Sequence, residues 1–306
     1  VEKAVEVVKE VPVQVVQTVI VEKAMPSESV VQTVVVEKEK IVVATPVPVT
    51  QTANGSLRAP PNNERFVLAE GQVPPPVSVP SRAGSGLEMS FINWGIMEPV
   101  LHQNAEGLID PAVSLWNQWE VAPDNSKVSW TLREGVEFHD GWGEMTAEDV
   151  VFSFTNSMQE GTLFYGVQEF PWMGESKTTG TYTGEMHFKE VNPRWVIRLS
   201  DAQTHQPWII SKKLYDEKGE EAALTEMVGT GPYKVISYAS RDRVELEAVE
   251  HWRVVPKTKN FGIVEIAEPL VFQAAFLTGE VDIAPIPNNL IKDTVARTPG
   301  ATFRPI

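Results

Sequence analysis

The sequence predicts a mixed α/β protein in which a mixed sheet is flanked by helices. Apolar residues alternate with polar ones over Val128, Trp130 and Leu132, which is the period of a half-buried strand. A helix start with a hydroxyl residue and two acidic residues follows closely. Strand and helix patterns then interleave to the end of the chain. This order favours a sheet with flanking helices over a sandwich or a bundle.

The composition supports a folded core and excludes several function classes. The chain has 306 residues, 42% of them hydrophobic, and nine Trp, so it has room and apolar surface for one large or two ordinary domains. A net charge of −15 opposes non-specific nucleic-acid binding, which requires a basic surface. The absence of cysteine excludes disulfides, thiolate metal sites and cysteine nucleophiles.

Residues 1–43 form a segment rich in Val, Glu and Lys. Residues 15–23 recur almost unchanged at 30–38, and Pro12 and Pro26 interrupt any continuous helix. Two interpretations stay open: a poorly ordered linker, and an extended or self-associating stalk that holds a globular domain away from a membrane. The valine content is high for a solvated coil, which also leaves β-like pairing or a helical bundle open.

Residues 44–85 are predicted to be a Pro-rich linker, because runs such as Pro74-Pro75-Pro76 favour extended polyproline-like backbone. A short strand over Phe66–Leu68 is expected within it. The globular part is predicted to occupy residues 86–306.

The central motif combines a strand, a turn and a helix. The strand covers residues 127–132, and Asp140-Gly141 is a turn signal. Thr146 occupies an N-cap position, and Glu148 and Asp149 place negative charge in the first helical turn. The apolar stripe of this helix is formed by Val150, Val151 and Phe154.

The other elements are predicted from the same periodicities and from glycine stops. In chain order they are a strand over 87–94, a short helix over 111–119, strands over 181–183 and 194–199, a helical stretch over 212–226 ended by Gly229, strands over 233–238, 243–249 and 264–266, a helix over 271–278 closed by Gly279, and a short strand over 281–284.

Four sequence blocks resemble one known family. Residues 132–141, Leu-Arg-Glu-Gly-Val-Glu-Phe-His-Asp-Gly, followed by Thr-Ala-Glu-Asp-Val at 146–150, resemble the hallmark of the family 5 extracellular solute-binding proteins of ABC transporters. The next blocks resemble the family's later motifs in the same order: Gly-Thr-Gly-Pro-Tyr-Lys-Val at 229–235, His-Trp-Arg at 251–253, and Leu-Thr-Gly-Glu-Val-Asp-Ile-Ala at 277–284.

The resemblance implies a fold and a location. Proteins of this family have two lobes around a hinged cleft, so the chain is expected to hold the N-terminal lobe of a periplasmic-binding-protein-like fold of class II (cluster C), with the C-terminal lobe missing. The sequence is then a fragment of a bacterial lipoprotein, periplasmic or on the cell surface, whose signal peptide and lipid anchor lie upstream. No run approaches the ~18 apolar residues that would cross a bilayer.

No catalytic, metal or cofactor site is predicted. The five histidines form no metal-binding pair; they are His102, His139, His187, His205 and His251. His139 and Asp140 are adjacent, so their side chains diverge, and a turn explains them better than a catalytic pair. Glu148 and Asp149 are explained by helix N-terminal electrostatics rather than by glycosidic chemistry. The sequence therefore predicts that the chain is not an enzyme.

Aromatic residues outside core periodicity are the candidates for ligand contact, because binding clefts favour aromatic walls with few polar groups. The resemblance implies that ligand-facing residues lie after the first strand and in the region following the capped helix. The candidate ligand-binding residues are Asn93, Trp94, Met97, Phe164 and Tyr165.

Three functions are considered. The leading hypothesis is the extracytoplasmic substrate-binding component of an ABC transporter, which captures a peptide or similar small solute for the permease subunits. Its membrane association would come only through an anchor not present in this chain. The alternative is a surface interaction or adhesion protein with a Val-rich stalk. A carbohydrate-active enzyme on a Trp-lined surface lacks a persuasive acid/base pair.

Overall fold

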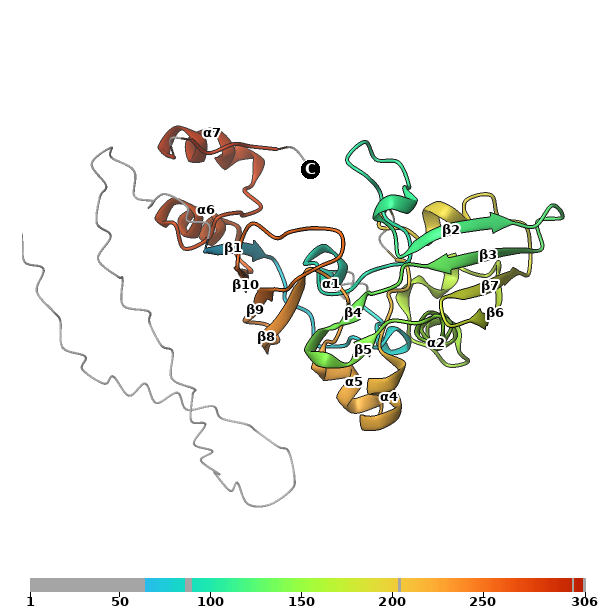
Figure 1. Ribbon diagram of the computed structural model, residues 1–306. Helices are drawn as coiled ribbons and strands as arrows, with labels where there is room; N and C mark the ends of the chain where they lie inside the picture. The colour runs from blue at the N-terminus through green and yellow to red at the C-terminus, as the bar shows by residue number, and fades with distance from the viewer. Residues whose placement is uncertain (1–63, 86–89, 203–204, 299, 305–306) are drawn as a thin grey trace, which may run out of the picture. The chain divides into compact units, whose positions relative to one another are not determined.

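The computed structural model describes residues 64–85, 90–202, 205–298 and 300–304. These residues form two four-stranded sheets, a two-stranded ribbon and the helices that pack around them (Figure 1). The predicted mixed α/β class is confirmed. The predicted stalk over 1–43 lies outside the described residues. No helix in the described ranges combines the length and apolar character needed to cross a membrane.

The elements have the following bounds. The strands are β1 (Arg65–Glu70), β2 (Trp116–Val121), β3 (Lys127–Leu132), β4 (Glu137–Phe138), β5 (Gly143–Glu144), β6 (Met173–Gly180), β7 (Thr183–Phe188), β8 (Tyr233–Ala239), β9 (Arg243–Ala248) and β10 (Asn260–Glu265). The helices are α1 (Ser90–Asn93), α2 (Ala147–Met158), α3 (Trp195–Arg198), α4 (Lys212–Lys218), α5 (Glu220–Glu226), α6 (Pro269–Thr278) and α7 (Asn288–Arg297). Short 3₁₀ turns are η1 (Pro80–Arg82), η3 (Pro111–Val113), η4 (His139–Gly141) and η5 (Tyr165–Glu169).

The first sheet has the order β1-β10-β9-β8, with β1 parallel to β10 and the other pairs antiparallel. The N–H of Val67 donates to the Asp282 carboxylate (2.8 Å), and the N–H of Asp282 donates to the Val67 carbonyl (2.7 Å). The chain after α6 therefore covers the outer edge of β1, which would otherwise expose unpaired backbone groups. The strand predicted over 281–284 is reduced to one bridge, between Leu68 and Ile283.

Strand β1 lies within the segment expected to be a Pro-rich linker. Val73 and Val79, which follow it, are fully buried. The Trp208 indole N–H donates to the Ser78 carbonyl (2.6 Å). Residues 65–85 thus contribute a strand and core side chains to the globular part, because apolar residues placed between the prolines point inward.

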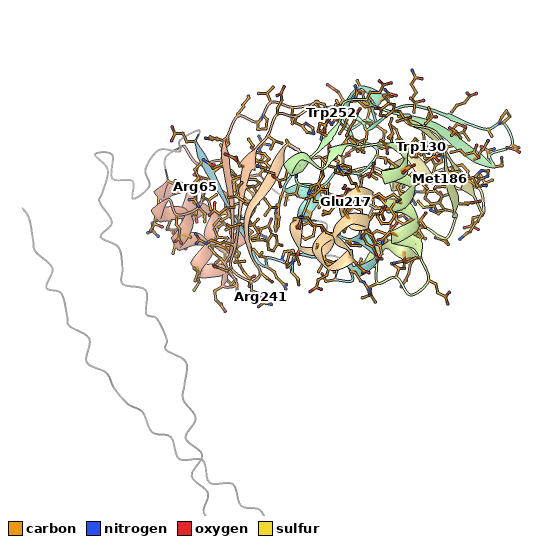
Figure 2. The ribbon with its side chains drawn as sticks, turned by 60° about the horizontal axis from the view of Figure 1, so that its bottom comes forward. Arg65, Trp130, Met186, Glu217, Arg241 and Trp252 are labelled. Atoms are coloured by element: carbon orange, nitrogen blue, oxygen red, sulfur yellow. The ribbon has the colours of Figure 1, made fainter. Side chains whose placement is uncertain are left out.

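The second sheet, β2-β3-β7-β6, is antiparallel throughout. Strand β3 is found where it was predicted, with Val128, Trp130 and Leu132 buried. The Trp130 ring stacks on Trp116 at a centroid distance of 5.2 Å, and a Cβ added to Gly184, opposite Trp130, would lie 2.2 Å from that ring. Figure 2 shows Trp130 close to Met186 in this part of the protein. A large side chain on one strand thus requires glycine on its neighbour.

Helix α2 begins as predicted, with Thr146 as its N-cap. The Asp149 carboxylate accepts hydrogen bonds from the Thr146 N–H (2.8 Å) and hydroxyl (3.0 Å). Its other oxygen accepts from the N–H of Lys212 (2.8 Å), at the start of α4. Burial raises the pKa of Asp149, and these hydrogen bonds oppose the rise. One carboxylate therefore caps α2 and joins it to α4, which agrees with the electrostatic role predicted for it.

We expect the Asp149→Ala substitution to lower the free energy of unfolding by about 2 kcal/mol, because it removes a cap and leaves buried donors unpaired. Urea denaturation followed by circular dichroism measures this loss. Glu148→Ala is the matched control, since Glu148 lies in the same helical turn but is exposed. Equal losses for the two variants would show that Asp149 acts only through its charge near the helix terminus.

Two predicted strands are helical. Of the strand predicted over 87–94, Ser90–Asn93 forms α1, and residues 86–89 lie outside the description. The strand predicted over 194–199 is wrong, because Trp195–Arg198 forms α3. Trp195 and Leu199 are both buried, which is the i, i+4 spacing of a helix face. A short apolar run fits both the two-residue period of a strand and the 3.6-residue period of a helix, and the burial pattern here is that of a helix.

Three other predictions needed correction. The helix predicted over 111–119 is limited to the η3 turn, after which the chain enters β2. Residues 181–182 form the connection between β6 and β7 rather than a strand. The helix predicted over 212–226 is divided into α4 and α5 at Gly219, whose φ of 86° is incompatible with a right-handed helix.

The core consists of a large cluster and a smaller one. The large cluster contains side chains from both four-stranded sheets and from α2. The smaller one packs α6 against β1 and includes Val67, Ala69, Phe272 and Ala275. Helix α6 ends at Gly279, with φ of 80°, as its glycine stop predicted.

Candidate functional site

The glycine loop, residues 229–231, packs directly on the backbone of residues 95–97. The N–H of Gly231 donates to the Ile96 carbonyl (3.0 Å), and the N–H of Tyr233 donates to the Gly95 carbonyl (3.0 Å). A Cβ at Gly229 would lie 2.0 Å from the Ile96 oxygen, and one at Gly231 would lie 2.1 Å from the Gly95 oxygen. The glycines of this motif are thus required by close backbone contact.

His139, which belongs to the block at residues 132–141, contacts this glycine loop through its backbone and its ring. Its backbone N–H donates to the Gly229 carbonyl (2.9 Å), and its ring Nε2 lies 2.8 Å from the Gly231 carbonyl. The ring Nδ1 accepts from the N–H of Gly229 (3.3 Å). Asp140 instead pairs with Lys234 at the surface (3.2 Å), so the two neighbouring side chains diverge as expected. Burial lowers the pKa of His139, which favours the neutral ring.

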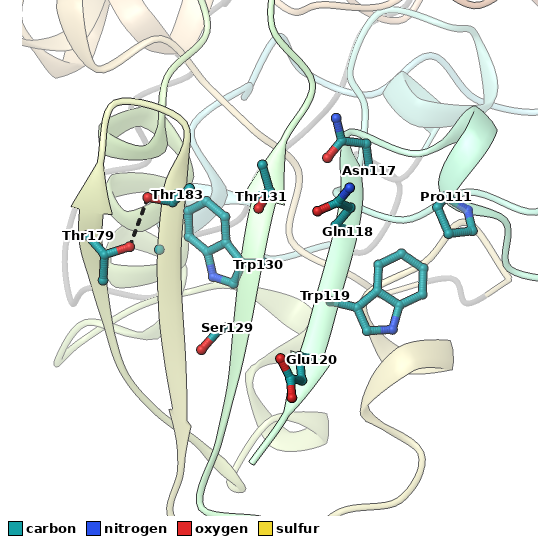
Figure 3. A pocket seen from close by; sticks show the side chains of 11 residues that line it. Pro111, Asn117, Gln118, Trp119, Glu120, Ser129, Trp130, Thr131, Thr179 and Thr183 are labelled. Carbon is teal, nitrogen blue, oxygen red and sulfur yellow. Dashed lines mark hydrogen bonds between the residues drawn. The ribbon is translucent and has the colours of Figure 1, made fainter.

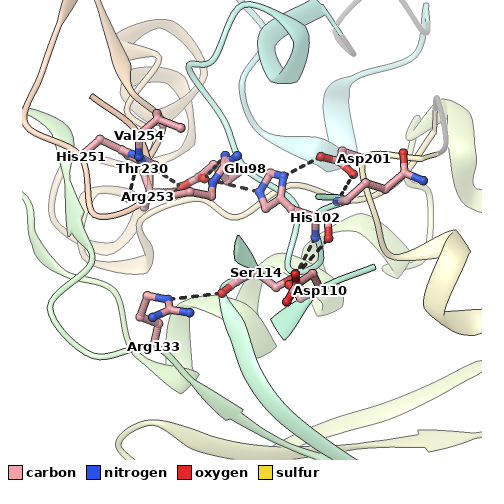
Figure 4. A network of polar contacts seen from close by, with 12 residues as sticks. Glu98, His102, Asp110, Ser114, Arg133, Asp201, Thr230, His251, Arg253 and Val254 are labelled. Atoms are coloured by element: carbon pink, nitrogen blue, oxygen red, sulfur yellow. Dashed lines mark hydrogen bonds and ion pairs between the residues drawn. The ribbon is translucent and has the colours of Figure 1, made fainter. Parts of the chain in front are cut away.

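A buried carboxylate, Glu98, is the centre of a polar cluster (Figure 4). Its side chain is 2% exposed. One oxygen accepts from the Thr230 hydroxyl (3.0 Å) and lies 3.3 Å from His251 Nε2, and the other accepts from the Arg253 guanidinium (3.0 Å) and lies 3.4 Å from His102 Nε2. Burial raises the pKa of Glu98, but its polar contacts with His102 and His251 outweigh burial and hold that pKa well below its usual value.

His102 connects this cluster to a second carboxylate. Its Nδ1 lies 2.8 Å from Asp201 Oδ2, and its own backbone N–H donates to the Ser114 hydroxyl (2.9 Å). Burial lowers the pKa of His102, but the hydrogen bond to Asp201 and the nearby negative charge of Glu98 raise it above the usual value overall.

Trp252, in the block at residues 251–253, contacts the side chains of two arginines. The Arg133 guanidinium is 4.4 Å from the centre of the Trp252 ring, and the Arg253 guanidinium is 5.7 Å from it. Arg133 follows β3 of the second sheet, whereas Trp252 follows β9 of the first. This cation–π contact therefore joins the two sheets outside the Glu98 cluster.

The five predicted ligand-binding residues fall into two groups. Trp94, Met97 and Phe164 are buried, with exposures of 2%, 1% and 1%, whereas Tyr165 is 52% exposed and Asn93 is also exposed. Trp94 and Phe164 belong to one aromatic cluster, which is continued by Phe91 and Trp208. Met97 lies against the glycine loop. Tyr165 contacts the ring of His205, at 4.6 Å.

The Glu98 cluster was not predicted. Its sequence signal is a carboxylate within the apolar run Ile96-Met97-Glu98-Pro99-Val100-Leu101, followed by His102. A charged residue in such a run requires a partner if the run is buried. Glu70 was not predicted either: its carboxylate accepts from the Trp94 indole N–H (3.5 Å), and burial raises its pKa.

A groove of about 660 Å³ lies over the second sheet (Figure 3). Its lining combines hydroxyl and amide side chains with Trp119, and includes Gln118, Ser129, Thr131 and Thr183. None of the five predicted ligand-binding residues is among those that line it. Within the described residues, no group of three or more His, Asp or Glu side chains has a metal-binding arrangement.

The comparisons identify relatives of the chain. The family model "bacterial extracellular solute-binding proteins, family 5 Middle" matches residues 111–303. The chain is 24% identical over 201 residues to the dipeptide-binding protein of Escherichia coli (strain K12), covering 60% of this chain and 37% of that protein. It is 28% identical over 176 residues to Protein XP55 of Streptomyces lividans, covering 56% and 31%. The chain thus spans about a third of the length of these curated relatives.

Solved structures show the same fold. The periplasmic binding protein DppA from Helicobacter pylori, in complex with peptide STSA, has a TM-score of 0.65 at 20% identity, over 77% of this chain and 49% of that one. OppA from Haemophilus influenzae, in complex with RPPGFSPFR, has a TM-score of 0.65 at 17% identity, over 78% and 50%. The described part therefore corresponds to about half of a periplasmic-binding-protein fold. The family model covers more than half of the sequence, and the chain belongs to the bacterial extracellular solute-binding proteins of family 5.

Proposed function

We propose that the chain is part of the substrate-binding component of an ABC importer, which captures a peptide or a similar small solute outside the cytoplasm and delivers it to the permease subunits. The observation that carries this proposal is the family match over residues 111–303. The similarity of the described residues to periplasmic-binding-protein structures supports it. An exported protein of this kind is periplasmic or on the cell surface, and we propose a lipid anchor for it.

A peptide is favoured as the solute by the relatives. The curated relative from Escherichia coli is a dipeptide-binding protein, and the DppA and OppA structures contain peptides. Other structures of the fold contain mannopinic acid or Fe(III)-EDTA. The class of solute is therefore the part of the proposal that most needs a direct test.

We propose that Asn93 and Tyr165 contact the solute, because their side chains are exposed. The buried residues Trp94, Met97 and Phe164 would then form the wall that supports them. A pocket usually buries 70–90% of its ligand, so we propose that a second lobe supplies the remaining contacts and that the chain alone binds more weakly than the whole protein.

Isothermal titration calorimetry tests this function. The titrants are pools of dipeptides, tripeptides and longer peptides, with oligosaccharides and nickel–histidine as the comparison. We expect heat of binding from at least one peptide pool, and about a tenfold weaker affinity for Asn93→Ala or Tyr165→Ala, which corresponds to about 1.4 kcal/mol.

Val191→Ala is the control, because Val191 is 65% exposed and was not predicted to bind. A whole protein that binds no peptide but binds another solute would contradict the peptide assignment. Unchanged affinity in both variants would contradict the assignment of Asn93 and Tyr165.

A further inference from the structure

The histidines around the glycine loop face different sets of hydrogen-bond donors and acceptors. His139 has Nε2 at 2.8 Å from the Gly231 carbonyl and accepts on Nδ1 from the N–H of Gly229 (3.3 Å). One ring nitrogen must therefore donate while the other accepts. A neutral imidazole with its proton on Nε2 satisfies both contacts.

His251 has the same arrangement. Its Nε2 faces Glu98 Oε2 at 3.3 Å, and its Nδ1 accepts from the backbone N–H groups of Arg253 (3.2 Å) and Val254 (3.3 Å). The neutral ring again fits, with its proton directed at the carboxylate.

His102 differs, because both of its ring nitrogens face carboxylates. Asp201 Oδ2 lies 2.8 Å from Nδ1, and Glu98 Oε1 lies 3.4 Å from Nε2. A neutral ring has one N–H, so either tautomer would direct a lone pair at a carboxylate, and only the imidazolium presents a donor to each. The Nε2 contact lacks hydrogen-bond geometry, and it becomes an ion pair when the ring is protonated. His102 is 3% exposed, so bulk water cannot replace these partners.

The charges around His102 balance only when it is protonated. The carboxylates of Glu98 and Asp201 face it, and Arg253 is the cation on the far side of Glu98. His251 contributes no charge in the neutral form deduced above. The imidazolium and Arg253 then neutralise the two carboxylates, whereas a neutral His102 leaves an excess negative charge beside the buried Glu98.

The segment that carries His102 contacts groups next to both four-stranded sheets, so the charge of His102 affects the contact between the sheets. Glu98 contacts Thr230 and Arg253, which adjoin strands of the first sheet. On the other side, the Trp116 N–H at the start of β2 donates to the Val100 carbonyl (3.0 Å), and the Asp201 N–H donates to the Leu101 carbonyl (3.2 Å). Residues 98–102 therefore connect the two sheets.

We propose that Glu98, His102, Asp201 and Arg253 form a proton-dependent latch between the two sheets, which the His102 imidazolium closes and which loosens when that proton is lost at alkaline pH. This proposal is independent of the solute and goes beyond the proposed transport function. The pKa of His102 is raised, so its stabilising contribution is complete below the unfolded value of about 6.5 and is lost as the pH rises through the folded value. The pKa of His139 is lowered, so His139 titrates on the acid side of this range.

Long-range ¹H–¹⁵N NMR correlation of the ring nitrogens tests the latch on the wild-type chain at pH 7. We expect both nitrogens of His102 to be protonated, and His139 and His251 to be neutral with the proton on Nε2. A neutral His102 at pH 7 would overturn the proposal. These spectra decide the matter whether or not a variant folds.

Thermal unfolding between pH 6 and pH 9 gives a second readout. We expect the unfolding midpoint of the wild type to exceed that of His102→Gln at pH 6, and this difference to decrease steadily as the pH rises. His187→Gln is the control, because His187 is a 39% exposed histidine that contacts only Glu185 among the carboxylates of the described residues. If the difference in unfolding midpoint between wild type and His102→Gln does not change with pH, the proposed latch is wrong and His102 contributes to stability only through packing.

Discussion

Gly231→Ala is expected to lower the free energy of unfolding by about 3 kcal/mol, because the new methyl group overpacks a site with no room for it. The added Cβ would lie 2.1 Å from the Gly95 carbonyl oxygen and 2.9 Å from the Ile96 oxygen. Both are backbone atoms, so no side-chain rotation can relieve the contact. The φ of Gly231 is not positive, which makes the expected effect steric rather than conformational. In a domain of this size the unfolding midpoint would fall by roughly 10 °C.

Gly71→Ala is the matched control for this experiment. A Cβ at Gly71 meets nothing within 4 Å, and Gly71 is exposed. Differential scanning calorimetry of the two variants compares a crowded glycine with an open one. If both midpoints stay within a degree of the wild type, the close contact between the glycine loop and residues 95–97 is not present in solution.

Glu98→Ala should cost about 3–5 kcal/mol, which is the range for breaking a buried ion pair by removing one partner. The substitution leaves Arg253 and His102 without their shared carboxylate and the Thr230 hydroxyl without its acceptor. The pKa of Glu98 is held well below its usual value. Its contribution is therefore complete at neutral pH and is lost only as the pH falls through the folded value.

Chemical denaturation at pH 7 measures this loss. Repeating the measurement at acid pH checks the direction of the pH dependence, because the difference in free energy of unfolding between wild type and Glu98→Ala should become smaller there. Glu226→Ala is the control, because Glu226 pairs with Lys218 at the surface, where an ion pair contributes only about 0–1 kcal/mol. A loss for Glu98→Ala no larger than that of the control would mean that the cluster adds nothing to stability.

The elements that the sequence predicted well carry local stop and start signals. Helix α2 has Thr146 and Asp149 at its start, and α6 has Gly279 at its end. Strand β3 has three alternating apolar residues that all reach the core. These signals act within a few residues, so they can be recognised in the sequence without knowledge of the tertiary contacts. The predictions failed at α1 and α3, which are apolar runs too short for their periodicity to separate a strand from a helix.

The candidate site was predictable only in part. The motif blocks placed the chain in its family, and the region from Asn93 to Met97 does lie beside the glycine loop. The sequence could not show that Trp94, Met97 and Phe164 are buried while Asn93 and Tyr165 are exposed. Exposure depends on what packs over each side chain, and that is a property of the assembled fold.

The sequence by itself determined the mixed α/β class, the capped helix, the family and the exclusion of cysteine chemistry. Tertiary structure alone decided the partners of the buried charges. Glu98 and Arg253 are 155 residues apart in sequence, yet their side chains are 3.0 Å apart. It also decided the directions in which the pKa values of His102 and His139 shift, because those directions depend on the groups that face each ring and on its burial. Local propensity acts over a few bonds, whereas the desolvation and pairing of a charge depend on every segment that folding brings around it.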